Sequence, residues 1–229
     1  AAVNTPTVLW ARRGSLAEEI NASHVNSDYL ETFRLPEQLR ATDSLADAVG
    51  RADVVVMAVP SHGYRDVALE AAESIRPWVP VVSLAKGLER NSLKRMSEVT
   101  AEVMPGHPVA VLTGPNLAKE ILAGQPAASV VAIADPTIAH ELQIIFSRPS
   151  LRIYTNGDVV GCEVAGVVKN VIAIAAGMAK GMGFGDNTRA TLITRGLAEM
   201  ARLGVAMGAE PATFAGLAGM GDLIATCSS

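Results

Sequence analysis

Apolar, β-branched runs alternate with helical patterns along most of this chain, and that alternation constrains the fold more than any other feature. The strand-like runs are TVLWA, DVVVMAV, VPVVSLA, VAVLT, AASVVAIA and LRIYT. The segments between them that read as helices are SLAEEINAS, YRDVALEAAESI, SLKRMSEVTAEVM, NLAKEILAG and IAHELQIIF. Strands form unbroken apolar runs where helices cover both faces of a sheet. The pattern therefore predicts an α/β fold with a doubly wound, mostly parallel sheet.

Beyond Asp158 the strand signal stops, and helical periodicity continues to the end of the sequence. We place a domain boundary within TNGD, which gives an α/β domain at 1–157 and an all-helical domain at 158–229. Two helix starts carry capping signals. Ser15 with Glu18 three residues later predicts a capping box, and Asp186 or Asn187 is the expected N-cap of a second long helix.

Composition excludes several classes of function. The formal net charge is -4 and the charges are scattered, so the surface offers no basic stripe for a nucleic acid. The longest uninterrupted apolar runs fall far short of the roughly 20 residues that span a bilayer, so we expect no membrane span. Two cysteines form no disulfide framework, which indicates a reducing cytoplasm, and the four histidines show no metal-ligand spacing. We expect no metal site.

Residues that directly follow the predicted strands are candidates for a ligand site, because ligands of open α/β sheets bind beyond the carboxyl ends of the strands. These residues are Arg12 and Arg13, Pro60 and Ser61, Lys86, and Gly114 with Asn116. Taken singly, each also fits an ordinary loop charge or turn. Their convergence on one edge of the sheet favours a binding site.

One lysine, Lys169, lies inside the apolar stretch EVAGVVKNVIAIAAG. A helix that is apolar all round is expected to be buried, so this lysine either extends to a nearby surface or lies in a pocket. Small neighbours one turn away, Gly166 and Ala173, leave space above it for a small ligand. A buried ammonium group suits general acid and base chemistry, and the amide of Asn170 beside it could anchor a ligand.

Two pairs of residues four apart follow in the helical part. Arg195 and Glu199 predict a modest surface ion pair. Asp222 and Thr226 lie on one helical face among glycines and aliphatic residues. Asp222 fits two roles equally well, the N-cap of a helix or the buried partner of Lys169.

Several of these blocks together resemble the bacterial NAD(P)-dependent glycerol-3-phosphate dehydrogenase family. They are SLAKG, LTGPN, YTNGDVVGCEVAGVVKNVIAIAAGMAKGMGFGDN, LITRGLAEMARLGVAMGA and GLAGMGDLIATC, and the similarity covers essentially the whole chain. It implies a Rossmann-like cofactor domain followed by a helical substrate domain. It also implies hydride transfer between NAD(P)H and C2 of dihydroxyacetone phosphate or sn-glycerol 3-phosphate, supplying phospholipid synthesis.

The resemblance assigns chemical roles to four residues. Lys169 matches the catalytic lysine that exchanges a proton with the C2 oxygen of the substrate. Lys86 matches a lysine that contacts both substrate and cofactor. Asp222 and Thr226 match residues that position the lysine and the substrate oxygen.

Further residues are assigned to binding. By the resemblance, Gly114 and Asn116 contact the substrate and Ala118 contacts the cofactor. Arg12 and Arg13 stand where an acidic residue would hold a ribose 2′-hydroxyl, and they suit a 2′-phosphate instead, which favours NADPH over NADH. The full set of expected cofactor contacts is Arg12, Arg13, Pro60, Lys86 and Ala118.

Two features of the family lie outside this sequence, its glycine-rich G-x-G-x-x-G turn and the arginine that clamps the substrate phosphate. We therefore expect the chain to be an incomplete piece. One alternative is a related two-domain dehydrogenase that acts on another hydroxy acid or acyl thioester. The other is a catalytically silent nucleotide-binding or dimerisation module, against which intact Lys86, Lys169 and Asp222 argue. A homodimer is left open.

Overall fold

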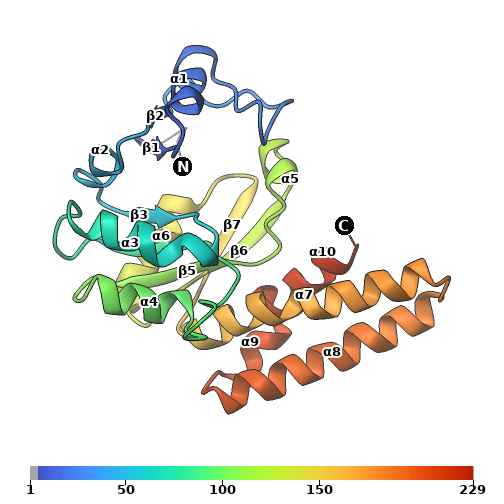
Figure 1. Ribbon diagram of the computed structural model, residues 1–229. Coiled ribbons are helices and arrows are strands. Elements are labelled where there is room, and N and C mark those ends of the chain that lie inside the picture. The colour runs from blue at the N-terminus through green and yellow to red at the C-terminus, as the bar shows by residue number, and fades with distance from the viewer. Residues whose placement is uncertain (1–4, 229) are drawn as a thin grey trace.

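The central element of the fold is a five-stranded sheet in the order β3-β4-β5-β6-β7. Figure 1 shows the computed structural model, which describes residues 5–228, so the outermost residues of both predicted domains lie outside it. The strands are β3 (Val55–Met57), β4 (Val81–Ser83), β5 (Val109–Thr113), β6 (Ala127–Ala132) and β7 (Leu151–Asn156). Neighbouring strands run parallel except for β5 and β6. The prediction of a mostly parallel sheet is confirmed.

Two further strands, β1 (Val8–Trp10) and β2 (Arg40–Thr42), pair in parallel as a separate small sheet. The expectation that all the strand-like runs belong to one sheet is therefore wrong for TVLWA. Within residues 5–228 no strand pairs with both β1 and β3, so the ladder is interrupted there. Figure 1 shows β1, β2 and α1 (Gly14–Ser23) at one end of the molecule, above the main sheet.

Helices cover both faces of the main sheet. They include α2 (Leu45–Val49), α3 (Tyr64–Ala72), α4 (Met96–Val103) and α6 (Pro136–Phe146), with a short 3-10 turn η1 at Ser61–Gly63 before α3. The short helix α5 (Ala118–Leu122) has no buried residue. Successive residues of a strand face opposite sides. Val81 packs in a cluster with Tyr64 and Met96, whereas Val82 packs in another with Leu142, and both valines are fully buried. This two-sided burial is why the strands read as unbroken apolar runs.

Three predicted helix starts differ from the structure. The α1 helix has Arg13 at its N-cap with no side-chain cap bond, so the Ser15–Glu18 capping box is wrong. The helix predicted to start at Asp186 or Asn187 is α8 (Asp186–Ala206), and its N-cap is Gly185. Asp186 therefore lies in the first turn and does not cap the helix. The α4 helix begins at Met96 because the preceding residues form a tight loop, in which Leu93 has a positive φ of 56°.

The helical domain is a hairpin of two long helices, α7 (Val159–Gly181) and α8 (Asp186–Ala206), which lie side by side in Figure 1. Three short elements follow: α9 (Pro211–Ala215), a π-helical segment η2 (Leu217–Gly221) and α10 (Asp222–Ser228). Asp158 caps α7 by accepting the Gly161 N–H at 2.8 Å. Its second oxygen accepts from the backbone N–H of Glu210 at 2.8 Å. Glu210 is the N-cap of α9, so the Asp158 carboxylate links the start of α7 to the start of α9.

The α7 helix is buried on one side only, contrary to the expectation from its composition. Its outward stripe is exposed: Val171, Ile174 and Met178, followed by Met182 directly after the helix. By length and composition α7 could cross a membrane, and half of its most apolar window is buried in the protein. A core helix passes the same test.

Candidate active site

Two lysines from different domains meet at one carboxylate. Lys86 follows β4, Lys169 lies in the middle of α7, and Asp222 opens α10. Lys169 Nζ donates to Asp222 Oδ1 at 2.7 Å, and Lys86 Nζ donates to Asp222 Oδ2 at 2.7 Å. Asp222 therefore pairs with Lys169, one of the two roles left open by the sequence, and it also binds the second lysine.

Burial makes this cluster electrostatically unusual. The side chains of Asp222 and Lys169 are only 3% and 8% exposed, whereas that of Lys86 is 26% exposed. Burial lowers the pKa of Lys86, the positive charge of Lys169 lowers it further, and Asp222 opposes the shift. Two ammonium groups share one carboxylate, so the cluster carries a net positive charge. Solvent and ligands reach this charge at Lys86, the most exposed of the three side chains. Such a site attracts an anionic ligand.

Thr226 completes the surroundings of Lys169. Its hydroxyl accepts from Lys169 Nζ at 2.8 Å and donates to the Asp222 carbonyl at 2.7 Å, one turn back in α10. An ammonium group has three N–H donors. Asp222 and Thr226 occupy two of them, so the protein fixes the direction of the third. That geometry suits a ligand oxygen held at Lys169.

The loop after β5 contributes a backbone acceptor. Lys86 Nζ donates to the Gly114 carbonyl at 3.1 Å. Gly114 has a φ of 125°, and a Cβ there would lie 3.3 Å from Ser129 Cα in β6. Both the backbone conformation and the close approach to β6 therefore require glycine at this position.

Asn116 lies beside the same loop, and its side chain is held by β6. The Ser129 hydroxyl donates to Asn116 Oδ1, and Ser129 is buried. With its oxygen occupied in this way, the Asn116 amide presents its Nδ2 donors to any ligand. Nothing in the sequence pointed to Ser129, which lies in the apolar run AASVVAIA.

The remaining predicted residues lie outside this cluster. Arg12, Pro60, Ala118 and Asn170 are exposed, and no hydrogen bond within residues 5–228 is described for their side chains. Arg13 is exposed and forms an ion pair with Asp28. The assignments of these five residues to cofactor or substrate therefore stay predictions. Elsewhere, the surface ion pair of Arg195 and Glu199 is confirmed at 3.4 Å.

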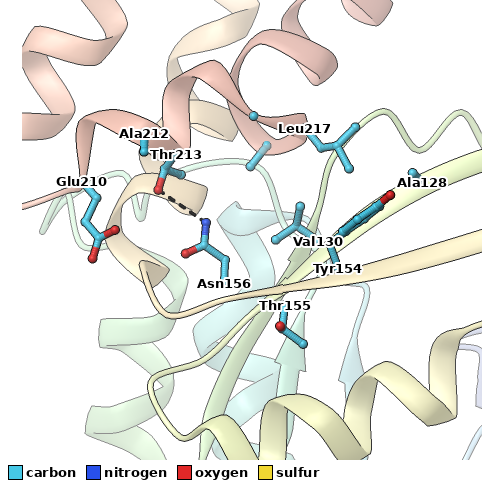
Figure 2. Close-up of a pocket in the computed structure, with 11 residues that line it drawn as sticks. Ala128, Val130, Tyr154, Thr155, Asn156, Glu210, Ala212, Thr213 and Leu217 are labelled. Carbon is cyan, nitrogen blue, oxygen red and sulfur yellow. Dashed lines mark hydrogen bonds between the residues drawn. The ribbon is translucent and has the colours of Figure 1, made fainter.

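A cavity of about 450 Å³ lies away from the two lysines. Figure 2 shows it between β6, β7 and the α9 region, with Asn156 and Thr213 hydrogen-bonded across it at 3.4 Å. Its lining includes one carboxylate, that of Glu210, and no lysine or arginine. In the described part of the chain, no group of three or more histidine, cysteine or acidic side chains is arranged to hold a metal ion.

The site lies where the mostly parallel sheet meets the helical domain, and Lys86 after β4 and Lys169 of α7 share the Asp222 carboxylate. Open α/β sheets bind ligands, dinucleotides among them, at this edge, so the arrangement is typical of the class of two-domain, pyridine-nucleotide-dependent dehydrogenases.

Comparison with known proteins identifies the family. The sequence matches the description "NAD-dependent glycerol-3-phosphate dehydrogenase N-terminus" over residues 1–139 and "NAD-dependent glycerol-3-phosphate dehydrogenase C-terminus" over residues 158–229. The chain belongs to the NAD-dependent glycerol-3-phosphate dehydrogenase family. The predicted family, and with it the prediction of an NAD(P)-dependent oxidoreductase, is confirmed.

Individual relatives agree with this result. "Glycerol-3-phosphate dehydrogenase [NAD(P)+] 2" of Sphingopyxis alaskensis is 60% identical over 99% of this chain and 68% of that protein. "Glycerol-3-phosphate dehydrogenase [NAD(P)+]" of Mycobacterium avium is 53% identical over 98% of this chain and 66% of its own length. The crystal structure of glycerol-3-phosphate dehydrogenase from Coxiella burnetii superposes with a TM-score of 0.94 at 34% identity, covering 99% of this chain and 70% of that one. The chain thus spans about two thirds of the length of these relatives.

Proposed function

We propose that the full-length protein interconverts dihydroxyacetone phosphate and sn-glycerol 3-phosphate by direct hydride transfer with NADPH or NADH. The observation that carries the proposal is the Asp222 carboxylate, which holds Lys86 and Lys169 at 2.7 Å each. A silent binding module has no need for two buried or half-buried cations on one carboxylate, because burying charge is costly. An enzyme that must bind an anion and move a proton does need them.

The nicotinamide cofactor supplies the hydride in the reducing direction. Lys169 donates a hydrogen bond to the substrate oxygen at C2, stabilises the negative charge that develops there and then protonates it. Such a contribution is worth about two to four orders of magnitude in rate. Lys86 adds a second positive charge, and Asp222 with Thr226 keeps the Lys169 ammonium directed at the oxygen.

Further substrate and cofactor contacts are proposed from where the residues lie in the fold. Asn116, with its oxygen occupied by Ser129, donates to the substrate from Nδ2, and the Gly114 loop forms the wall beside Lys86. Asn170, exposed one residue after Lys169, donates to the substrate from α7. The cofactor is contacted by residues that follow β1, β3 and β5 in the chain, namely Arg12, Arg13, Pro60 and Ala118.

The test is the oxidation of NADPH and of NADH by the full-length protein with dihydroxyacetone phosphate. The matched control substrate is dihydroxyacetone, which lacks the phosphate. Turnover of the phosphorylated ketone and a large loss with the unphosphorylated one supports the proposal. Equal turnover of both ketones, or turnover of an acyl thioester or keto acid in their place, would show a related dehydrogenase with another substrate.

The cofactor preference gives a separate prediction. We expect NADPH to be preferred, because the exposed Arg12 can pair with a 2′-phosphate that NADH lacks. Arg12→Ala should raise KM for NADPH about tenfold and leave KM for NADH nearly unchanged. Arg202→Ala, an exposed arginine in α8, is the control and should change neither constant. Equal kcat/KM values for the two cofactors in the wild type would contradict this prediction.

Ser129 gives a second prediction. In Ser129→Ala the Asn116 amide loses the hydroxyl that fixes its orientation, so a substrate hydrogen bond weakens. KM for dihydroxyacetone phosphate should rise about fivefold, the equivalent of about 1 kcal/mol, with little change in kcat. The control is Ser44→Ala, which removes the N-cap of α2 and should lower only the melting temperature. An unchanged KM in Ser129→Ala would show that Asn116 does not bind the substrate.

We also propose that the protein acts in the cytoplasm, supplies glycerol 3-phosphate for phospholipids and assembles as a homodimer. The absence of a disulfide framework in the sequence supports the location. Cell fractionation tests the location, and sedimentation of the purified full-length protein tests the oligomeric state.

A further inference from the structure

A second buried carboxylate, Glu163, joins the two domains about two turns before Lys169 in α7. Its side chain is only 5% exposed. Isolating a carboxylate from water is costly unless charged and hydrogen-bonding partners surround it. The partners of Glu163 all come from the other domain, from the start of α4.

The contacts of Glu163 use both of its oxygens. Oε1 accepts from the backbone N–H of Ser97 at 2.9 Å, and Oε2 accepts from Arg95 Nη1 at 2.9 Å and from the Ser97 hydroxyl. Burial raises the pKa of Glu163, and the contacts to Ser97 and Arg95 oppose that shift. Arg95 is itself largely buried, with 14% of its side chain exposed. The pair therefore behaves as an enclosed ion pair with directional hydrogen bonds, which fixes geometry better than a surface pair does.

Arg95 ends the loop that begins at Lys86. Leu88 and Arg95 form an antiparallel bridge, and Glu89 N donates to the Lys94 carbonyl at 2.9 Å, so the two ends of the loop are held together. The side chain of Lys86 also touches α7, because a Cβ on Gly166 would lie 3.5 Å from Lys86 Cγ. Glu163 and Gly166 are three residues apart and share one face of α7. The Lys86 loop thus rests on α7 at two neighbouring points.

From this geometry we infer that Glu163 is a positioning residue, which keeps the Lys86 loop in register with α7 so that Lys86 and Lys169 meet at Asp222. The inference rests on the proposed function, because the reaction is what needs both lysines in one place. Asp222 lies in the seven-residue helix α10 and contacts Lys86 only at the end of its side chain, at Nζ. Glu163 holds the other end of the Lys86 loop, at Arg95, from a position in α7 six residues before Lys169.

The test compares kcat and KM of full-length Glu163→Ala, Glu163→Gln and Glu98→Gln at a temperature well below the melting transition. Glu98 also pairs with Arg95, at 3.1 Å, but within one domain and at the surface, so it is the matched control. Glu163→Ala should lower kcat tenfold or more, and Glu163→Gln, which keeps an acceptor for the Ser97 N–H, should recover part of the loss. Glu98→Gln should lower the melting temperature and keep wild-type kcat.

Two readouts separate positioning from mere stability. In Glu163→Ala the Lys86 loop lies less tightly on α7, so Lys86 gains water and its contact with Asp222 weakens. Burial is the largest cause of the lowered pKa of Lys86, so its relief outweighs the weaker contact with Asp222. The pKa of Lys86 then rises toward its ordinary value, and the limb of the pH–rate profile that belongs to Lys86 should move to higher pH. Amide hydrogen exchange at the start of α4 should also accelerate. Wild-type kcat in Glu163→Ala, or an equal loss in Glu98→Gln, would overturn the inference.

The same variants remain informative if the proposed function fails. A wild-type protein inactive on dihydroxyacetone phosphate would refute that function, and the inference would then be judged by the rate at which an amine reagent modifies Lys86, read by peptide mass spectrometry. A changed rate in Glu163→Ala supports the inference, and an unchanged rate overturns it. If Glu163→Ala does not fold, Glu163→Gln and Glu163→Asp undergo the same measurements with the same criteria.

Discussion

Lys169→Ala in the full-length protein is expected to lower kcat by about a thousandfold or more while the protein stays folded. The variant removes the group that protonates the C2 oxygen. It also removes a buried positive charge, which offsets the small cavity that it leaves. Asp222 keeps Lys86 as a partner at 2.7 Å, so no carboxylate is left unpaired and the melting temperature should change little.

The measurement is kcat with dihydroxyacetone phosphate, with thermal unfolding recorded beside it. Lys180→Ala, at the exposed end of α7, is the control and should be fully active. Lys169→Arg should remain as impaired as the alanine variant, because an arginine keeps its proton at every working pH and cannot act as acid and base. A Lys169→Ala protein that unfolds with its activity per folded molecule unchanged would show that this lysine is structural.

The lysines and Asp222 could be predicted from the sequence for a physical reason. A buried charge in an apolar helix needs a partner, and parallel strands bring the residues that follow them to the same edge of the sheet. Glu163 lies in the same apolar stretch as Lys169 and needs a partner for the same reason, but the sequence does not indicate which residues supply it. Its partners Arg95 and Ser97 are far away in sequence, and periodicity does not say which distant loop will cover a helix face.

Other differences have similar causes. The exposed stripe of Val171, Ile174 and Met178 on α7 is apolar, as the sequence shows, but only packing reveals that α8, β5 and α10 cover the opposite side. The helix starts differ from the prediction where the N-cap residue forms no side-chain cap hydrogen bond, as with Arg13 before α1 and Gly185 before α8. Before α4 the N-cap is Arg95, whose backbone N–H donates to the Glu98 side chain at 2.8 Å. Composition predicts which residues can be buried, and the tertiary arrangement decides which of them are.

Asp222→Asn should have the other large effect, because it removes the counterion of both lysines at once. Two ammonium groups then share a buried site with a neutral amide, and the free energy of unfolding should fall by about 3 kcal/mol. The value of kcat/KM should fall about a thousandfold, since neither lysine keeps its direction. Asp186→Asn, an exposed carboxylate in the first turn of α8, is the control and should leave both quantities unchanged.

The pH–rate profile of Asp222→Asn should shift in a defined direction. Asp222 raises the pKa of Lys86 against the effect of burial, so its loss lowers that pKa further. The limb of the profile that belongs to Lys86 therefore moves to lower pH, opposite to the shift expected for Glu163→Ala. An unmoved limb in Asp222→Asn would mean that Lys86 does not depend on this carboxylate.

Combining Asp222→Asn with Lys169→Ala separates a catalytic cluster from a structural one. Residues that act as a unit are strongly non-additive, so the double variant should lose little more kcat/KM than Lys169→Ala alone. Its free energy of unfolding should exceed that of Asp222→Asn, because deleting Lys169 removes one of the two cations left without a counterion. Losses in kcat/KM that simply multiply, or a double variant less stable than either single one, would show that Lys169 and Asp222 contribute independently and that the shared carboxylate is not the basis of the site.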